Sequence, residues 1–218
     1  MKVQAKGVEL FYKKSGQGKA LILLHGNGED HHIFDKISEK LENNFTVYAI
    51  DSRNHGESTK TTNYDYEVMA EDLGAFIHAL KIAPVNIVGF SDGGIISLLL
   101  AMKDSGLVEK MALLGVNLKP SDFTDESYQF LKETYEQTQD PLFKLMLEQP
   151  NIELTDLKKI KVPSLIIAAE NDLYRPELFR ELNHALKGSK LMIMQGHSHD
   201  SYIVNQDLLY EDLLAFFQ

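Results

Sequence analysis

The sequence of 218 residues contains no cysteine, which excludes disulfide bonds, thiolate metal sites and cysteine nucleophiles. It also lacks a basic excess, because the formal net charge at pH 7 is −10. Nucleic acids and anionic membranes are bound through basic side chains, so neither is expected as a partner. No apolar run is long enough to span a bilayer, and residues 1–6 lack the apolar segment of a secretory signal. We therefore expect a cytoplasmic protein.

What the sequence does contain fits a single α/β domain over residues 1–218. Hydrophobic residues make up 44% and charged residues 25%, as in ordinary globular proteins. After a hairpin over residues 3–14, short apolar runs alternate with longer segments of helical periodicity. Strands are predicted at 20–24, 45–50, 85–88, 111–114, 163–169 and 191–194, and helices at 30–41, 66–80, 95–102, 176–186 and 207–217. This alternation predicts a mostly parallel central sheet with helices on both faces.

Residues 121–161 depart from this alternation. The stretch is more polar and contains two helical islands, at 127–136 and 141–148. We predict a short helical lid inserted in the domain over the edge of the sheet where the strands end. The alternative is a pair of surface helices that pack on the core.

The motif G-x-S-x-G occupies residues 89–93, between the predicted strand 85–88 and the predicted helix 95–102. Glycines on both sides allow a sharp turn with close backbone approach. The helix N-terminus behind Ser91 offers free N–H groups and a positive dipole, which suit a nucleophile whose attack creates an oxyanion. A bare G-x-S-x-G also occurs by chance in roughly one chain in fifteen of this length. Other residues must therefore supply the partners of Ser91.

Polar clusters follow most of the predicted strands, so they share one edge of the sheet, where open α/β sheets bind ligands. A neutral serine needs a base to take its proton, and the base needs an orienting acid. Among the polar residues at strand ends downstream of Ser91 there is one acidic cluster, with Glu170 and Asp172, and then one histidine cluster, with His197 and His199. The order Ser, acid, His is therefore available, with two candidates for each partner.

Four of these stretches together resemble motifs of the α/β-hydrolase family. Residues 25–28 (His-Gly-Asn-Gly) resemble its oxyanion loop, and residues 89–94 its nucleophile elbow. Residues 51–58 resemble its D-x-R-G-x-G-x-S loop, with asparagine in place of the first glycine, and residues 169–172 resemble its acid turn, with alanine in place of glycine. The elbow and the approach to the last strand are similar to a valacyclovir-hydrolase-like branch of small carboxylesterases. The resemblance covers nearly the whole chain and implies the α/β-hydrolase fold and a serine hydrolase.

The resemblance also implies a role for each residue. Ser91 is the expected nucleophile, Asp172 the acid, with Glu170 as the alternative, and the backbone N–H groups of Asn27 and Asp92 the oxyanion hole. For the base, the family pattern places the histidine about five residues after the last apolar position of the strand. Counting from Met194 selects His199, although His197 directly follows a glycine as the family's histidine usually does.

The remaining histidines give no clear sign of a metal. His197 and His199 share one face of an extended chain, and His25, His55 and Asp200 could complete a site, but nothing in their spacing requires one. We predict neither a metal nor a cofactor. Asp30 is the expected N-cap of its helix, and the adjacent residues 31 and 32, both histidine, are expected to face solvent.

The expected reaction is hydrolysis of a small-molecule ester through an acyl-enzyme. A short lid favours small to medium acyl groups. The same triad could act on an amide or peptide, a lactone or a C–C bond, since it is common to all of these reactions. A hypothesis of another class is an inactive hydrolase scaffold that binds a small ligand. The intact Ser, Asp and His pattern argues against that last hypothesis.

Overall fold

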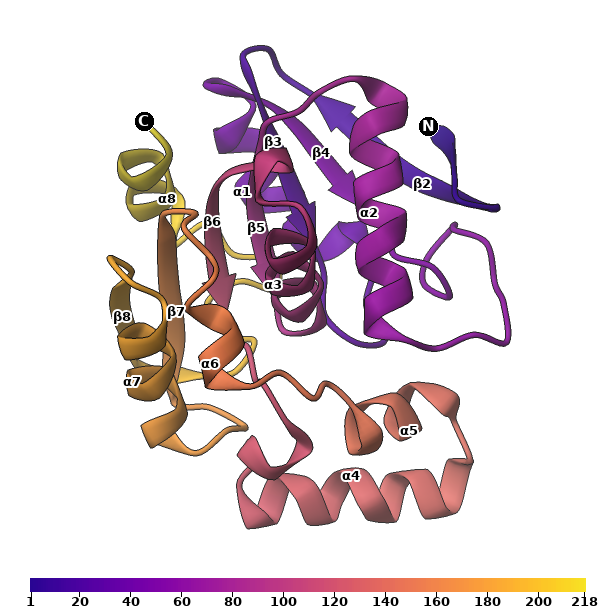
Figure 1. Cartoon of the computed structure of the whole chain (residues 1–218), viewed down its shortest axis with the longest axis vertical. Coiled ribbons are helices and arrows are strands. Elements are labelled where there is room, and N and C mark those ends of the chain that lie inside the picture. The colour runs from indigo at the N-terminus through magenta and orange to yellow at the C-terminus, as the bar shows by residue number, and fades with distance from the viewer.

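The structure is a computed structural model that describes all 218 residues. Its centre is an eight-stranded sheet in the order β1-β2-β4-β3-β5-β6-β7-β8, and Figure 1 shows the strands from β8 on the left to β2 on the right. The strands are β1 (Lys2–Ala5), β2 (Val8–Ser15), β3 (Lys19–Leu24), β4 (Phe45–Ile50), β5 (Val85–Phe90), β6 (Val108–Leu114), β7 (Ser164–Asn171) and β8 (Lys190–Ser198). β1 and β2 pair as an antiparallel hairpin, β2 is antiparallel to β4, and the remaining pairs are parallel. The predicted α/β class and mostly parallel sheet are confirmed.

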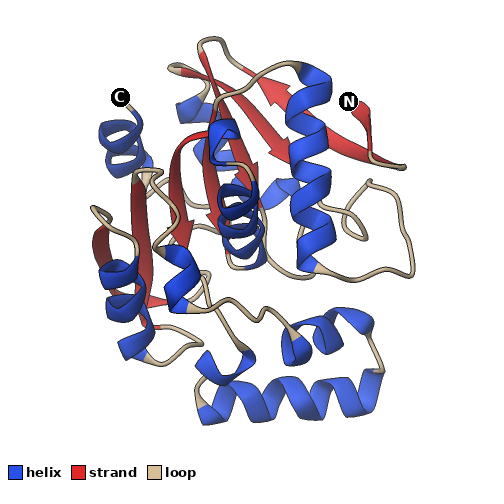
Figure 2. Cartoon of the chain, in the orientation of Figure 1, coloured by secondary structure: helices blue, strands red, loops and turns tan.

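Helices cover both faces of the sheet (Figure 2). One core contains side chains of α2 (Tyr66–Leu80), α3 (Asp92–Lys103) and α7 (Pro176–Ala185), and the other contains side chains of α1 (Asp35–Leu41) and α8 (Tyr210–Phe217). Successive residues of β3 enter alternate cores, because side chains alternate across a strand. A central strand must therefore be apolar at every position, which explains its uninterrupted hydrophobic run. None of the helices has the length and apolar character needed to cross a membrane.

Several boundaries differ from the predictions for local reasons. The expected helix at 30–41 begins as a 3-10 turn, η1 (His31–Phe34), and continues as α1. Asp30 is its N-cap, as predicted, and accepts a hydrogen bond from the His32 N–H at 2.8 Å. β8 extends beyond the predicted 191–194, because after an irregularity in β7 it pairs again with Asn171. Its last residues are polar and carry no hydrophobic signal. The closing helix begins at residue 210 rather than 207.

The chain between β6 and β7 is helical and lies beyond the edge where the parallel strands end (Figure 1). The segment contains the 3-10 turn η3 (Pro120–Asp122) and the helices α4 (Asp125–Thr138), α5 (Pro141–Glu148) and α6 (Leu154–Leu157), whereas a further 3-10 turn, η2 (Ser105–Leu107), lies before β6. The two predicted helical islands correspond to α4 and α5, whereas α6 was not predicted. α4 and α5 begin at N-caps, Thr124 and Asp140, whose side chains accept backbone N–H groups. Each of the two helices buries a single residue, Leu131 or Leu145.

Candidate active site

Ser91 stands at the turn from β5 to α3 in a strained backbone conformation. Its φ of 50° lies in the left-handed region, which a serine adopts only where the surrounding structure enforces it. Two glycines make the turn possible. A Cβ on Gly89 would lie 2.4 Å from the Gly93 carbonyl oxygen, and a Cβ on Gly93 would lie 2.2 Å from the Leu24 carbonyl oxygen. The sequence motif therefore exists because larger residues would collide with backbone on both sides of Ser91.

Asp172 follows β7, His199 follows β8, and a hydrogen bond joins the two side chains. His199 Nδ1 lies 2.7 Å from Asp172 Oδ1, and the Asp172 side chain is 2% exposed. The same carboxylate accepts the N–H groups of Ala169 and Leu173 at 3.0 and 2.8 Å. An ionised carboxylate only accepts hydrogen bonds, so Nδ1 carries the proton of the neutral ring and Nε2 keeps its lone pair. His199 is thereby oriented with one basic nitrogen free.

The two alternative residues have other partners. Glu170 is exposed, and its carboxylate accepts the Gly196 N–H at 2.8 Å. His197 Nδ1 lies 3.0 Å from the hydroxyl of Ser201. Neither side chain bonds to the other or to Asp172, so the structure brings together the residues selected from the family pattern.

Ser91 and His199 line the same cavity, but they form no hydrogen bond to each other in this conformation. The Phe90 ring packs on the His199 ring with 5.0 Å between centroids. The Tyr174 hydroxyl lies beside Ser91, and the Tyr174 ring meets His199 edge-on at 5.5 Å. Hydrogen bonds used in catalysis are often long in the free enzyme and tighten when substrate binds.

Two backbone N–H groups next to Ser91 have no partner in the protein. One belongs to Asp92, the first residue of α3, and the other to Asn27 in the loop after β3. The two residues are linked, because Asn27 Nδ2 donates to Asp92 Oδ2 at 3.0 Å and to the Leu142 carbonyl in α5 at 3.3 Å. Asp92 also accepts the Tyr66 hydroxyl at 2.7 Å, and burial raises the pKa of its carboxyl. Free N–H groups of this kind can hold a negatively charged oxygen.

Buried histidines hold the Asn27 loop against the loop after β4. His25 Nδ1 donates to the Gly26 carbonyl at 2.7 Å, and its Nε2 accepts the Ser52 N–H at 3.0 Å. Burial and the neighbouring His55 lower the pKa of His25 to about 4, so its ring is neutral near pH 7. His55 Nε2 accepts the Gly28 N–H at 3.1 Å. These residues are positioned to fix the loop rather than to bind a metal.

The expectation that residues 31 and 32 both face solvent is wrong for the first of them. His31 is buried, and its Nδ1 lies 2.8 Å from Asp51 Oδ1, while His32 is exposed and contacts Asp35. The turn at η1 places His31 over the start of the loop after β4. Asp30, His31 and His32 are the one acidic and histidine group with ligand atoms within 4.8 Å of one another. The partners of the two histidines show that this cluster serves the local fold.

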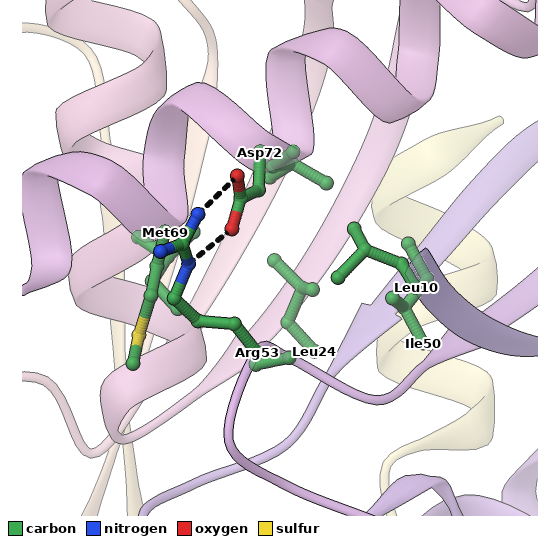
Figure 3. A pocket seen from close by; sticks show the side chains of 9 residues that line it. Leu10, Leu24, Ile50, Arg53, Met69 and Asp72 are labelled. Carbon is green, nitrogen blue, oxygen red and sulfur yellow. Dashed lines mark hydrogen bonds and ion pairs between the residues drawn. The ribbon is translucent and has the colours of Figure 1, made fainter. Parts of the chain in front are cut away.

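The loop after β4 is also tied to α2 by a buried ion pair (Figure 3). Arg53 forms two parallel hydrogen bonds with Asp72, one of them 2.7 Å between Nη2 and Oδ1. Both side chains are almost fully buried, and they border a void of about 10 Å³ among apolar side chains. Bidentate pairing fixes the guanidinium in direction as well as distance. The pair therefore anchors this loop to the helix that also carries Tyr66.

The cavity beside Ser91 has a volume of about 420 Å³ and two unlike sides. Its polar side comes from the loops that follow β3, β7 and β8. Its apolar side comes mainly from the helical segment between β6 and β7, with Leu131, Leu142, Phe143 and Met146. Three carboxylic acids line it, and no lysine or arginine does: Glu29, Asp140 and Asp200. Such a cavity has the size and mixed character of a small-molecule site.

Sequence reasoning missed three side chains of this site. Burial raises the pKa of Glu29 to about 7, and burial also raises the pKa of the Tyr174 hydroxyl, which therefore stays protonated. Glu29 lies within the loop that the motif identified, and Tyr174 lies two residues after Asp172, so their positions were the available signal. Tyr66, at the start of α2, gave no signal in the sequence.

The fold agrees with comparisons to known proteins. The family model of the alpha/beta hydrolase fold matches residues 19–145. The chain is 29% identical to the serine hydrolase BPHL of Homo sapiens, over 93% of this chain and 80% of that protein. It is 26% identical to the pimeloyl-[acyl-carrier protein] methyl ester esterase of Neisseria meningitidis serogroup B, over 90% and 93% of the two chains.

Solved structures agree on the fold. The enol-lactonase from Burkholderia xenovorans LB400 superposes with a TM-score of 0.83 at 22% identity, covering 100% of this chain and 99% of that one. The chain therefore belongs to the α/β-hydrolase fold family, as its motifs predict. Within that family it is a serine hydrolase.

Proposed function

We propose that the protein hydrolyses small-molecule carboxylic esters through an acyl-enzyme, with Ser91 as nucleophile, His199 as base and Asp172 as orienting acid. The observation that carries the proposal is the 2.7 Å bond between Asp172 and His199, at the wall of the cavity that the strained Ser91 also lines. Similarity to a serine hydrolase and to a methyl ester esterase supports the same chemistry.

The proposed reaction begins when the Ser91 hydroxyl turns toward His199 Nε2. Nε2 takes the hydroxyl proton as Oγ bonds to the ester carbonyl carbon, and the N–H groups of Asn27 and Asp92 receive the negative oxygen. The C–O bond to the alcohol then breaks, and the imidazolium returns the proton to the leaving alkoxide. Water then attacks the carbonyl carbon of the acyl-enzyme as His199 takes its proton, the bond from that carbon to Ser91 Oγ breaks, and the imidazolium returns the proton to Oγ as the acid is released. Asp172 stays ionised throughout and stabilises the imidazolium.

The shape of the cavity supports acyl groups of small to medium size. Its apolar wall belongs to the segment 121–161, which we propose acts as a short lid over the single domain. At about 420 Å³ the cavity lies toward the lower end of the range for small-molecule sites. Lactones and amides would meet the same nucleophile, and the substrate panel therefore includes them beside the esters.

The test combines a substrate panel with an active-site label. The protein is assayed on nitrophenyl esters of increasing acyl length and on matched amides and lactones, and a fluorophosphonate is used to label its nucleophile. We expect fastest turnover of short and medium esters, labelling that is lost in Ser91→Ala and His199→Ala, and labelling retained in His197→Ala. Absence of labelling in the unmodified protein would favour the inactive scaffold, and labelling that survives His199→Ala would refute the assigned base.

A further inference from the structure

Glu29 is a carboxyl group in the active-site cavity that the proposed reaction does not use. It lies in the loop after β3, two residues beyond Asn27, and lines the same cavity as Ser91 and His199. Its carboxylate is close to the nucleophile. A Cβ placed on Gly26 would lie 2.8 Å from Glu29 Oε2 and 3.1 Å from Ser91 Cβ.

The hydrogen bonds of Glu29 close a tight turn around Asn27. Its carboxylate accepts the Gly26 N–H at 2.8 Å, and its own N–H points back to the Gly26 carbonyl at 3.4 Å. This reciprocal arrangement resembles the capping box at a helix start, in which a side chain and a backbone N–H satisfy each other. Glu29 thus bonds to both the N–H and the carbonyl of Gly26, which closes the turn.

Side chains hold the backbone on both sides of Asn27. The Glu29 carboxylate accepts a hydrogen bond from the Gly26 N–H, and His55 Nε2 accepts one from the Gly28 N–H. His25 Nδ1 donates to the Gly26 carbonyl. Among residues 26–29, the Asn27 N–H alone has no partner in the protein. Such a pattern leaves one donor free while preventing the loop from turning to satisfy it, which is the requirement for a preorganised oxyanion donor.

We propose that Glu29 is a positioning residue that fixes the oxyanion loop, so that the Asn27 N–H points at the developing charge. This inference rests on the proposed function, because it assumes that the Asn27 N–H serves as an oxyanion donor. The ionised carboxylate is the better acceptor for the Gly26 N–H, since charge-assisted hydrogen bonds are roughly twice as strong as neutral ones. Ionisation of Glu29 therefore tightens the loop.

The surroundings of Glu29 place this ionisation near neutral pH. Burial raises its pKa to about 7, against the opposing effects of the Gly26 N–H and His199. The acidic groups that face it are Asp92 at the start of α3 and Asp200 after β8, and Asp140 lines the same cavity. No lysine or arginine lines the cavity to offset these charges. The hydrogen bond that holds the loop is therefore expected to respond to pH near neutrality.

The test compares Glu29→Ala and Glu29→Gln with the unmodified protein, using the best ester from the panel at pH 5.5 to 9. The alanine variant removes the acceptor and is expected to lower kcat about 10- to 100-fold with little change in KM, somewhat less than the loss of a whole oxyanion donor. The glutamine variant keeps an acceptor oxygen and should recover most of kcat at its optimum. Glu57→Gln, an exposed glutamate of the neighbouring loop, is the control.

A second readout follows the amide resonance of Gly26 by NMR and does not depend on activity. In the unmodified protein it should titrate with a midpoint near pH 7, and in Glu29→Gln that titration should vanish. The inference is overturned if Glu29→Ala keeps full kcat or if the Gly26 amide titrates alike in both proteins. If the unmodified protein hydrolyses no substrate, the proposed function fails instead, and the Gly26 titration still decides whether Glu29 holds the loop.

Discussion

The two sides of the active-site cavity are built differently. The polar side includes the loop after β3, residues 25–30, which is hydrogen-bonded to the mostly buried loop after β4, residues 51–58, and most polar side chains of these two loops have hydrogen-bond partners. The α4–α5 segment opposite them buries only Leu131 and Leu145, and its Phe130 is 63% exposed. One side carries the proposed chemistry on a framework of satisfied buried groups, and the other presents an apolar surface on lightly anchored helices.

This difference indicates that one side of the cavity fixes the catalytic geometry, whereas the other side accommodates acyl groups. Catalytic geometry must be held within a fraction of an ångström, which requires side chains locked by packing and hydrogen bonds. A wall that receives acyl groups has no such requirement, and segments with few buried contacts open at low free-energy cost. A direct polar link between the sides is the hydrogen bond from Asn27 Nδ2 to the Leu142 carbonyl, and next to the cavity the Tyr66 N–H of α2 donates to the side chain of Gln149, just after α5. Changes on the framework side should therefore affect rate and stability, and changes on the α4–α5 side should affect substrate preference.

The largest effect is expected for Asp172→Asn. An asparagine can donate to His199 Nδ1, which would favour the tautomer with its proton on Nε2 and block its action as a base. By analogy with the corresponding change in serine proteases, kcat should fall on the order of 10⁴-fold with the fold intact. Steady-state kinetics on the best ester measures this loss. Glu170→Gln is the matched control, and an equal loss in that variant would mean that the acid is misassigned.

The next effect is on stability, through the buried Arg53–Asp72 pair. Asp72→Asn leaves the guanidinium buried without its counter-charge, which should lower the free energy of unfolding by about 3–5 kcal/mol. The exposed pair Lys119–Glu153, near the start of the α4–α5 segment, provides the comparison. Lys119→Met should cost less than about 1 kcal/mol, since exposed pairs contribute little.

Urea unfolding measures both losses. A double variant with apolar residues at positions 53 and 72 separates the cost of the unpaired charge from the loss of the contacts that the pair makes. If the unpaired charge is responsible, the double variant should recover much of the stability that Asp72→Asn loses. A loss in Asp72→Asn as small as in Lys119→Met would show that the framework loops are not held by this pair.

Much of this framework could be predicted from the sequence, because its signals are local. The apolar runs gave the strands, and the glycines around Ser91 gave the turn, since only glycine fits against the Leu24 carbonyl. The choice of His199 over His197 needed the family pattern, because the polar end of β8 carries no periodicity. Whether these residues act as proposed stays a prediction, although their contacts agree with it.

The rest could not be predicted, because it depends on which distant side chains the fold brings together. Nothing local indicates that His31 meets Asp51 or that the Tyr174 hydroxyl reaches Ser91. The environment of Glu29 likewise depends on residues that lie more than 60 positions away, Asp92 and His199 among them. Burial and charge at such positions are tertiary properties.

Glu29→Gln should show how much the buried, ionised carboxylate of Glu29 lowers the free energy of unfolding. The pKa of Glu29 is raised from 4.5 to about 7 on folding, so the folded protein holds this proton more tightly than the unfolded chain does. The stabilisation from that proton is complete below pH 4.5 and is lost as the pH rises through 7. Relative to the unmodified protein, Glu29→Gln should therefore gain about 2 kcal/mol at pH 8, after allowance for partial solvation, and little at pH 4.5. Urea unfolding at the two pH values checks this, and an equal change at both would contradict it.

The smallest effect is expected on the α4–α5 side, where Phe143 contributes to the apolar wall. Phe143→Ala removes a surface that only longer acyl chains reach, and one or two methylene groups in an apolar pocket are worth about 1–3 kcal/mol. The value of kcat/KM should fall about tenfold for hexanoyl or octanoyl esters and stay nearly constant for acetyl esters. Phe130→Ala, the same change on an exposed face of α4, should leave both unchanged. A uniform loss across acyl lengths in Phe143→Ala would mean that these helices also hold the catalytic geometry, and the division between the two sides of the cavity would not stand.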